Sequence, residues 1–330
     1  NETNQYDLKI FRTMQSVGTK NFSLVSNPPV FISGVNCRLT DEKFKSYLDF
    51  ASGSGTTALG HNHAGLKKTL YDQLETGINH IGPHFQVPAQ AQLYRELKKI
   101  LPQDLSRFHP SVSGSEATEV AVKAAMHATK ARRFIGFEGG YHGRTLGALS
   151  VSGEKGKNQV LGPFEPPTDI YEFPITTEIG YRVGQKIGNN SSKIAGIIIE
   201  PIQATAGLRV ADKEGLRFIC DTARKNKIPV IFDEVFTGFA RTAKLFAFEY
   251  YNIVPDLLIL GKSFAAGMPG ALVAGTENIL GQWESGTQSS TFQLNPLAAS
   301  AGIYLIKTLT TGGFLKNIGK LSQIFNEILR

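Results

Sequence analysis

An acidic pair and a lysine follow two apolar runs in the second half of the chain. Asp233 and Glu234 end the run Ile228 to Phe232, and Lys262 stands two residues after the run Leu257 to Leu260. In an open parallel sheet the carboxyl ends of neighbouring strands converge on one crevice, so Asp233 and Lys262 can meet across a small ligand. Pyridoxal phosphate (PLP) requires such a pair, a lysine for its Schiff base and an aspartate for its pyridine nitrogen. Alternatively, Asp233 caps a helix and Lys262 is a solvated loop residue.

A turn of small residues provides a second signal. Arg107 to Val112 is predicted to be a short strand, Ser113-Gly114-Ser115 a turn, and Glu116 to Lys130 a helix with apolar residues at the helical period. Free N–H groups and the positive end of the helix dipole would then face the crevice and could hold a phosphate. The alternative is an ordinary capping turn. The turn is neither a Walker loop nor GxGxxG, which argues against a dinucleotide-dependent dehydrogenase.

A glycine-rich loop follows the next predicted strand, Phe134 to Phe137. It carries Tyr141, His142 and Arg144. An aromatic ring at this place can stack on a flat cofactor, and an arginine can bind a carboxylate with two parallel hydrogen bonds. The alternative is a turn whose tyrosine only packs.

Strands and helices alternate along the rest of the chain. The buried-type strand Ile194 to Ile199 delivers Glu200 and Gln203 at its end, and a helix over Ala211 to Lys227 leads into the strand that carries Asp233. This alternation predicts an α/β fold with a mostly parallel sheet and helices on both faces. Elsewhere a helix is predicted over Pro88 to Ile100.

The N-terminal region is predicted to be a smaller β unit. Short strands are expected over Val30 to Val35 and Tyr47 to Phe50, on either side of a turn at Leu39-Thr40-Asp41. The nearby pair His61 and His63 could bind a metal, but no third ligand has suitable spacing, so a polar loop is the better interpretation and no metal is expected.

Composition narrows the class of protein. The chain has 330 residues, of which 41% are hydrophobic and 19% charged, which is a globular balance. The net charge of +7 is spread along the sequence, so neither nucleic acid nor a membrane is an expected partner. No apolar run is long enough to cross a membrane. Cys37 and Cys220 stand alone, which favours a reducing compartment and a cytoplasmic location.

Six motifs in order resemble the class III (ω-amino-acid type) aminotransferases, PLP enzymes of fold type I. The closest motif match is to the ornithine, acetylornithine and GABA aminotransferase group. The motifs are SGSEATEVAVKAA (113–125), YHGRTLGALS (141–150), EPIQATAG (200–207), IFDEVFTGFART (231–242), GKSFAAGMP (261–269) and TFQLNPLAA (291–299).

The resemblance implies a role for each motif residue. Lys262 would form the Schiff base and act as general base, while Asp233 would pair with the ring nitrogen. Thr291 would reach the phosphate of a neighbouring subunit, which implies a homodimer, and Arg144 would bind a substrate carboxylate. The remaining cofactor contacts would come from Ser113, Gly114, Ser115, Tyr141, His142, Glu200, Gln203 and Val235.

The implied reaction moves an amino group from an amino acid or ω-amine to a keto acid through pyridoxamine phosphate. An aminomutase, racemase or decarboxylase would share these motifs, and a non-catalytic truncated domain is a further alternative. Thr205 stands where the ornithine-type relatives have a glutamate that screens a second arginine. The segments 52–57 and 82–85 are expected to line the substrate pocket.

The resemblance also suggests how the chain is divided. Residues 1–58 would be the N-terminal segment of a small domain, 59–310 the large PLP-binding domain and 311–330 the start of a C-terminal region. The family's C-terminal small domain is expected to be missing. The chain would then be a naturally short variant, a fragment or an excised domain, and a naturally short chain is expected to expose an apolar face around Leu305, Leu309, Phe314, Leu315 and Leu321.

Overall fold

The computed structural model describes residues 28–154, 165–189 and 193–329. Its strands are β1 (Phe31–Val35), β2 (Arg38–Asp41), β3 (Ser46–Leu48), β4 (Arg107–Ser111), β5 (Arg133–Phe137), β6 (Thr168–Tyr171), β7 (Ile194–Ile199), β8 (Ile202–Gln203), β9 (Arg209–Val210), β10 (Val230–Asp233), β11 (Leu257–Leu260) and β12 (Ala271–Gly275). Its helices are α2 (Ser52–Gly55), α3 (Ala64–Leu74), α4 (Pro88–Ile100), α5 (Gly114–Thr129), α6 (Leu146–Ser150), α7 (Thr177–Asn189), α8 (Lys213–Lys225), α9 (Phe248–Tyr251), the 3-10 helix η2 (Lys262–Ala265), α10 (Glu277–Leu280), α11 (Pro296–Thr310) and α12 (Phe314–Leu329).

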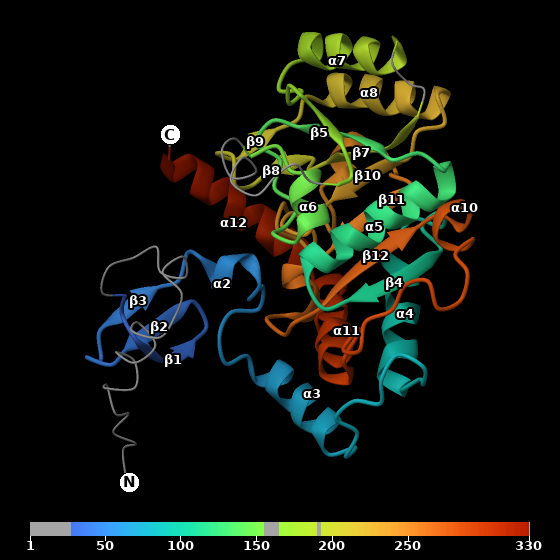
Figure 1. The fold of residues 1–330 in the computed structure, drawn as a ribbon. Coiled ribbons are helices and arrows are strands. Elements are labelled where there is room, and N and C mark those ends of the chain that lie inside the picture. The colour runs from blue at the N-terminus through green and yellow to red at the C-terminus, as the bar shows by residue number, and fades with distance from the viewer. Residues whose placement is uncertain (1–27, 155–164, 190–192, 330) are drawn as a thin grey trace.

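A seven-stranded sheet in the order β4-β12-β11-β10-β7-β5-β6 forms the centre of the molecule (Figure 1). The pairs from β11 to β6 are parallel, and β12 runs antiparallel to both of its neighbours. Since β12 alone is reversed, β4 points the same way as β11. The carboxyl ends of β4, β5, β7, β10 and β11 therefore lie along one edge, and the prediction of a mostly parallel α/β sheet is confirmed.

Both faces of the sheet are covered by helices because side chains alternate along each strand. Ile198, Ile231 and Ile259 pack in a cluster with Val120 and Ala121 of α5. Their strand neighbours point the other way, into a larger cluster with residues of α4, α8 and α11. Each fully buried aliphatic side chain contributes about 1.5–3 kcal/mol, so these clusters hold the strand ends in fixed positions.

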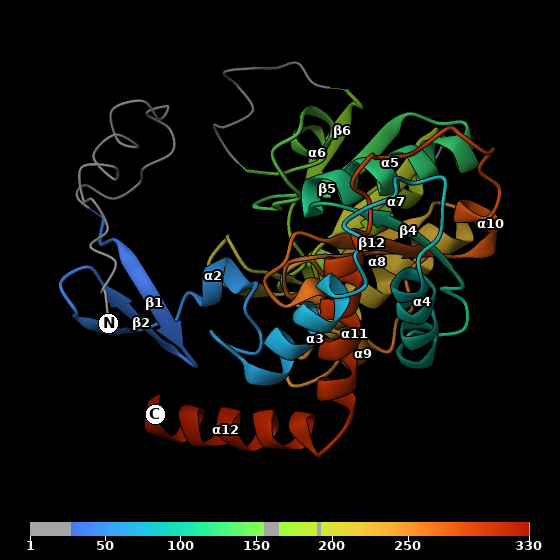
Figure 2. The same ribbon diagram turned by 90° about the horizontal axis from the view of Figure 1, so that it is seen from below.

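The three-stranded sheet β1-β2-β3 lies apart from the large sheet (Figure 2). The predicted turn at Leu39-Thr40-Asp41 is wrong, because these residues belong to the central strand β2. The turn comes after Asp41, whose Oδ1 accepts hydrogen bonds from the N–H groups of Lys43 at 3.0 Å and Lys45 at 2.9 Å.

The expected apolar surface near the C-terminal end of the sequence is only partly present. Leu305 and Leu309 belong to α11, which packs on α3 and α4, and they are 0% and 2% exposed. Phe314 and Leu315 are half-buried against the same core. Leu321 is exposed, on a helix α12 that projects from the body (Figure 2). Within the described ranges, no helix is both long and apolar enough to span a membrane.

Candidate active site

A cavity of about 160 Å³ opens at the edge of the sheet where the parallel strands end. Nine of the predicted site residues line it, namely Ser113, Gly114, Ser115, Tyr141, His142, Glu200, Asp233, Val235 and Lys262. They arrive from β4, β5, β7, β10 and β11, or from the loops that follow these strands. The convergence of strand ends predicted from the sequence is therefore what the structure shows.

Lys262 lies in the wall of this cavity and is half-buried rather than solvated. It follows β11 and Gly261 and begins η2 with a left-handed backbone, φ +46°. Non-glycine residues in this region are held there by their surroundings, and such strain is concentrated at functional sites. Burial lowers the pKa of the Lys262 amine, although Asp233 and Glu200 act in the opposite direction. A neutral amine therefore becomes accessible at lower pH than for a lysine in water.

Asp233 forms a buried pair with His142. Nδ1 of His142 lies 2.7 Å from Oδ2 of Asp233, and the side chains are 1% and 5% exposed. The N–H of Val235 donates to the other oxygen, Oδ1, at 3.0 Å. Burial opposes protonation of His142, but the hydrogen bond and the charge of Asp233 outweigh it and raise the pKa of the imidazole. No helix begins at Asp233, so it does not act as the helix cap considered above.

Glu200 supplies a second carboxyl group beside this pair. Its Oε2 accepts a hydrogen bond from the N–H of Tyr141 at 3.0 Å, which ties the ends of β5 and β7 together. Burial raises the pKa of Glu200 to about 7, while nearby His142 lowers it and Asp233 raises it further. The carboxyl group is thus protonated over a wider pH range than a glutamate in water.

The turn before α5 is a suitable anion site. Ser113 caps the helix, since its hydroxyl accepts from the N–H of Glu116 at 3.3 Å. The N–H groups of Gly114 and Ser115 have no partner in the described part of the chain, as the first turn of a helix leaves them free. Both groups lie at the positive end of the helix dipole. A Cβ on Gly114 would lie 3.1 Å from Cγ1 of Val235, so only glycine lets the turn approach that side chain closely.

Three predicted site residues lie outside the cavity wall. Gln203 is fully buried, with its Nε2 donating to the Glu138 carbonyl at 3.1 Å and its Oε1 accepting from Nε of Arg209 at 3.0 Å. Thr291 is exposed on the loop between α10 and α11. Arg144 stacks its guanidinium 4.7 Å from the centre of the Tyr141 ring and pairs with Glu154 at 2.6 Å.

Four residues of the cavity wall were not among the predicted site residues, namely Gly143, Ala204, Thr205 and Phe236. Phe236 lines the cavity, and the centre of its ring lies 4.5 Å from Nζ of Lys262. The only signal was its position three residues after Asp233 at the same strand end. The expected lining segments 52–57 and 82–85 contribute no side chain to this wall. Residue 55 does come close, since a Cβ there would lie 3.1 Å from the ring of Phe236.

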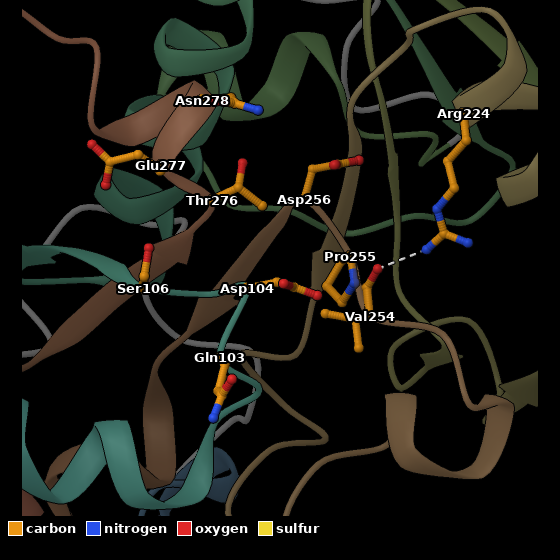
Figure 3. A pocket seen from close by; sticks show the side chains of 10 residues that line it. All are labelled: Gln103, Asp104, Ser106, Arg224, Val254, Pro255, Asp256, Thr276, Glu277 and Asn278. Atoms are coloured by element: carbon orange, nitrogen blue, oxygen red, sulfur yellow. Dashed lines mark hydrogen bonds between the residues drawn. The ribbon is translucent and has the colours of Figure 1, made fainter.

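A wider, open hollow of about 570 Å³ lies at the opposite end of β11 (Figure 3). Three of its four charged side chains, those of Arg224, Asp256 and Glu277, are bound to neighbours. Arg224 donates to the Val254 carbonyl at 2.8 Å, and Oδ2 of Asp256 accepts from the Val230 N–H at 2.8 Å. No lysine lies among the residues that line this hollow. The residues that the sequence predicted for catalysis and cofactor binding therefore gather at the smaller cavity.

Comparison with known proteins agrees with this geometry. The profile of the family "Aminotransferase class-III" matches residues 25–330. The chain belongs to the class III aminotransferases. An acetylornithine aminotransferase of Archaeoglobus fulgidus is 34% identical over 300 residues, which cover 90% of this chain and 76% of that protein. A [LysW]-aminoadipate semialdehyde/glutamate semialdehyde transaminase of Sulfolobus acidocaldarius is 30% identical over 318 residues, covering 96% and 78%.

Solved structures place the aminotransferase in the same fold. The ornithine aminotransferase of Toxoplasma gondii superposes with a TM-score of 0.88 at 25% identity, covering 98% of this chain and 76% of that one. The description of that structure reports partial occupancy of PLP at its active site. The predicted family, fold type I and PLP dependence are thereby confirmed. None of the three relatives is named as an aminomutase, racemase or decarboxylase.

The cavity of this aminotransferase fits the cofactor on chemical grounds. The free N–H groups of α5 suit the phosphate, the buried carboxylate of Asp233 suits a protonated ring nitrogen, and the Lys262 amine suits the aldehyde. Within the described ranges, no cluster of three or more histidine, cysteine or acidic side chains could hold a metal ion. His61 instead lies 2.8 Å from Asp49, and His63 caps α3.

Proposed function

We propose that Lys262 holds PLP and carries the proton in transamination, with Asp233 fixing the electronic state of the cofactor. The observation that carries this proposal is the meeting of Lys262, the Asp233–His142 pair and the α5 turn in one cavity. When bound, PLP withdraws electrons from the substrate's Cα–H bond and takes up the amino group before passing it to a keto acid.

The protein's own groups prepare this chemistry. Asp233 is held by the His142 imidazole and the Val235 N–H, so its carboxylate is oriented towards the cavity before any ligand arrives. Lys262, whose pKa burial lowers, is a free amine over more of the neutral range and can accept the Cα proton at Nζ. Ser115 keeps its hydroxyl hydrogen available for a phosphate oxygen, because its Oγ already accepts from the Arg144 N–H at 3.1 Å.

The roles of Gln203, Tyr141 and Val235 are assigned from their positions in or next to the cavity wall. Gln203 is one residue from the cavity-lining Ala204, and we assign it to the hydrogen-bond network under the cofactor's phenolic oxygen, together with Glu200. Tyr141 and Val235 both line the cavity and are assigned to the two faces of the ring.

An amino acid is the donor that Arg144 favours. Its guanidinium lies beside the cavity-lining Tyr141 and is paired with Glu154, so a substrate carboxylate would exchange with the glutamate. One relative is named for acetylornithine and another for aminoadipate semialdehyde and glutamate semialdehyde.

A homodimer is proposed from the surface around Thr291. The loop that carries Thr291 contacts His80, and the rings of His80 and Phe292 lie 5.5 Å apart. Phe292 exposes 62% of its surface on this loop. A second copy of the chain would cover this patch and bring Thr291 to the neighbouring phosphate site.

We propose a cytoplasmic location and domain boundaries near residues 58 and 310. The cysteines of the described chain are free thiols, Cys37 exposed and Cys220 buried, which supports a cytoplasmic location. The separate sheet β1-β2-β3 supports an N-terminal unit ending near residue 58, and the break between α11 and α12 supports a boundary near residue 310.

The absorption spectrum of the purified protein tests the proposed function. A visible band that disappears on addition of one amino donor and returns with a keto acid would support it and identify the substrate class. Lys262→Ala should lose that band and all turnover, while Lys68→Ala, at an exposed ion pair on α3, should retain both. Turnover by Lys262→Ala would overturn the assignment of the lysine.

A further inference from the structure

The reacting amine has an aromatic neighbour that the family resemblance does not assign. Nζ of Lys262 lies 4.5 Å from the centre of the Phe236 ring, well within the range of a cation–π contact. The guanidinium carbon of Arg241 lies 5.6 Å from the same centre. The ring is half-buried and forms part of the cavity wall. The Lys262 amine and the Arg241 guanidinium therefore both lie near one aromatic ring in the cavity wall.

The position of this ring is fixed by the strained segment around Gly55. A Cβ at Gly55 would lie 3.1 Å from Cε2 of Phe236, and the backbone there is left-handed with φ +83°, so the ring needs a glycine beside it. The Gly55 carbonyl accepts from Nη2 of Arg241 at 3.0 Å and from Oγ of Ser263 at 2.9 Å. Because Ser263 directly follows Lys262, the ring and the lysine share one anchor.

We propose that Phe236 is a positioning residue that holds the Lys262 side chain in its protonated form while the lysine is free of the cofactor. The proposal rests on the proposed role of Lys262 as the proton carrier. In that step the proton leaves the substrate Cα for Nζ, and the electron pair of the C–H bond stays on the substrate and the cofactor. Nζ then becomes an ammonium next to the negative face of the ring, which stabilises it.

Other charged groups face the same amine and affect its protonation equilibrium. Asp233 from β10 and Glu200 after β7 favour the ammonium, whereas Arg241 disfavours it. His142 shields the amine from part of the Asp233 charge by pairing with that carboxylate at 2.7 Å. The aromatic face adds attraction without adding a carboxylate that could capture the proton. The ring thus keeps the ammonium near the cavity instead of letting it fold against Asp233.

NMR on the whole enzyme tests the role of the ring. The protein is labelled with ¹³Cε-lysine and prepared with the amino group already on the cofactor, which leaves Lys262 as a free amine. Loss of one signal in Lys262→Ala assigns the resonance, and its pH titration gives the acid dissociation constant of the amine. Phe236→Leu removes the aromatic face and keeps an apolar side chain. Phe236→Tyr keeps the face and is the matched control.

The expected result is a rise in the acid dissociation constant of Lys262 by about fivefold in Phe236→Leu, with Phe236→Tyr close to the native protein. The acid limb of the kcat profile should then move to lower pH and its plateau should fall, because the lysine becomes a weaker base. A change below about twofold in Phe236→Leu would overturn the proposal, as would an equal change in Phe236→Tyr. Phe236→Met replaces the leucine variant if that protein does not fold.

Failure of the proposed function would be visible separately. If Lys262→Ala still formed the covalent cofactor band, the lysine assignment itself would be wrong. If native enzyme lost and regained its band normally while Phe236→Leu titrated like the native protein, only the inference about the ring would fall.

Discussion

Glu234 is a buried carboxyl group whose removal should destabilise the loop that covers the active site. It follows Asp233 but points into the core, where it is 0% exposed. Its Oε2 accepts from the Ala247 N–H at 2.6 Å and from the Thr237 hydroxyl at 3.0 Å. Its Oε1 accepts from the Phe248 N–H at 2.7 Å. These bonds close the loop that carries Val235, Phe236 and Arg241.

The cost of removing the carboxyl group follows from the donors it leaves behind. Glu234→Ala strands two buried N–H groups and one hydroxyl, and each unsatisfied donor costs about 1–3 kcal/mol. With the hydroxyl free to turn to another acceptor, the two N–H groups predict a loss of about 3 kcal/mol. Glu234→Gln keeps one carbonyl oxygen but places an NH₂ group against the remaining N–H, so about half that loss is expected.

Urea denaturation followed by circular dichroism would measure both variants near pH 7.5. Thermal unfolding followed by the same signal should show a fall of about 5 °C in the melting temperature of Glu234→Ala. Glu75 is exposed at the end of α3, so Glu75→Ala and Glu75→Gln should each change stability by less than about 0.5 kcal/mol. If Glu234→Ala were no less stable than Glu75→Ala, the carboxyl group would not be holding the loop.

Three further predictions concern charge and close packing at the site. Burial raises the pKa of Glu234 from its ordinary 4.5 to about 7, so its stabilising protonation is complete below 4.5 and is lost as the pH rises through 7. The free energy of unfolding of the native protein should therefore fall, relative to that of Glu234→Gln, as the pH rises through this window. If urea denaturation gave the same difference between the two proteins at both ends of the window, this prediction would be wrong. Arg144→Lys should raise KM for an amino-acid donor about tenfold and leave KM for a donor amine without a carboxylate unchanged, since only the first uses a bidentate contact. Gly114→Ala should weaken PLP binding about tenfold because its Cβ meets Val235, and fluorescence titration should show recovery in Gly114→Ala/Val235→Ala; an equally weak double variant would exclude that clash as the cause.

Five of the seven strands of the large sheet, all except β6 and β12, could be predicted from the sequence because their signals are local. Ile194–Ile199 and Leu257–Leu260 are continuous apolar runs, and Pro88–Ile100 begins with proline and carries leucines on one face, so their predicted bounds are those observed. Strand ends then brought Asp233 and Lys262 into one cavity, as a parallel sheet requires.

The remaining features depend on contacts between distant residues. Arg144 stacks on Tyr141 and pairs with Glu154, a choice among partners that spacing does not encode. Phe236 faces Lys262 only because the Gly55 backbone leaves room for its ring. In the N-terminal sheet, Asp41 determines the turn through its side chain, so the hydrophobic pattern alone placed the turn too early.

The position of β12 late in the sequence also affects when the strand that leads into the Ser113 turn can pair during folding. β4 occupies one edge of the seven-stranded sheet, and its neighbour there is β12, with Ser111 opposite Ala271 and Arg107 opposite Gly275. The strand that supports the Ser113 turn is thus synthesised early but acquires its sheet partner only after Lys262 has left the ribosome. Pairing over such a sequence separation is slow, because a long loop must close first. The pairing that supports the Ser113 turn is therefore expected to be a late event in folding.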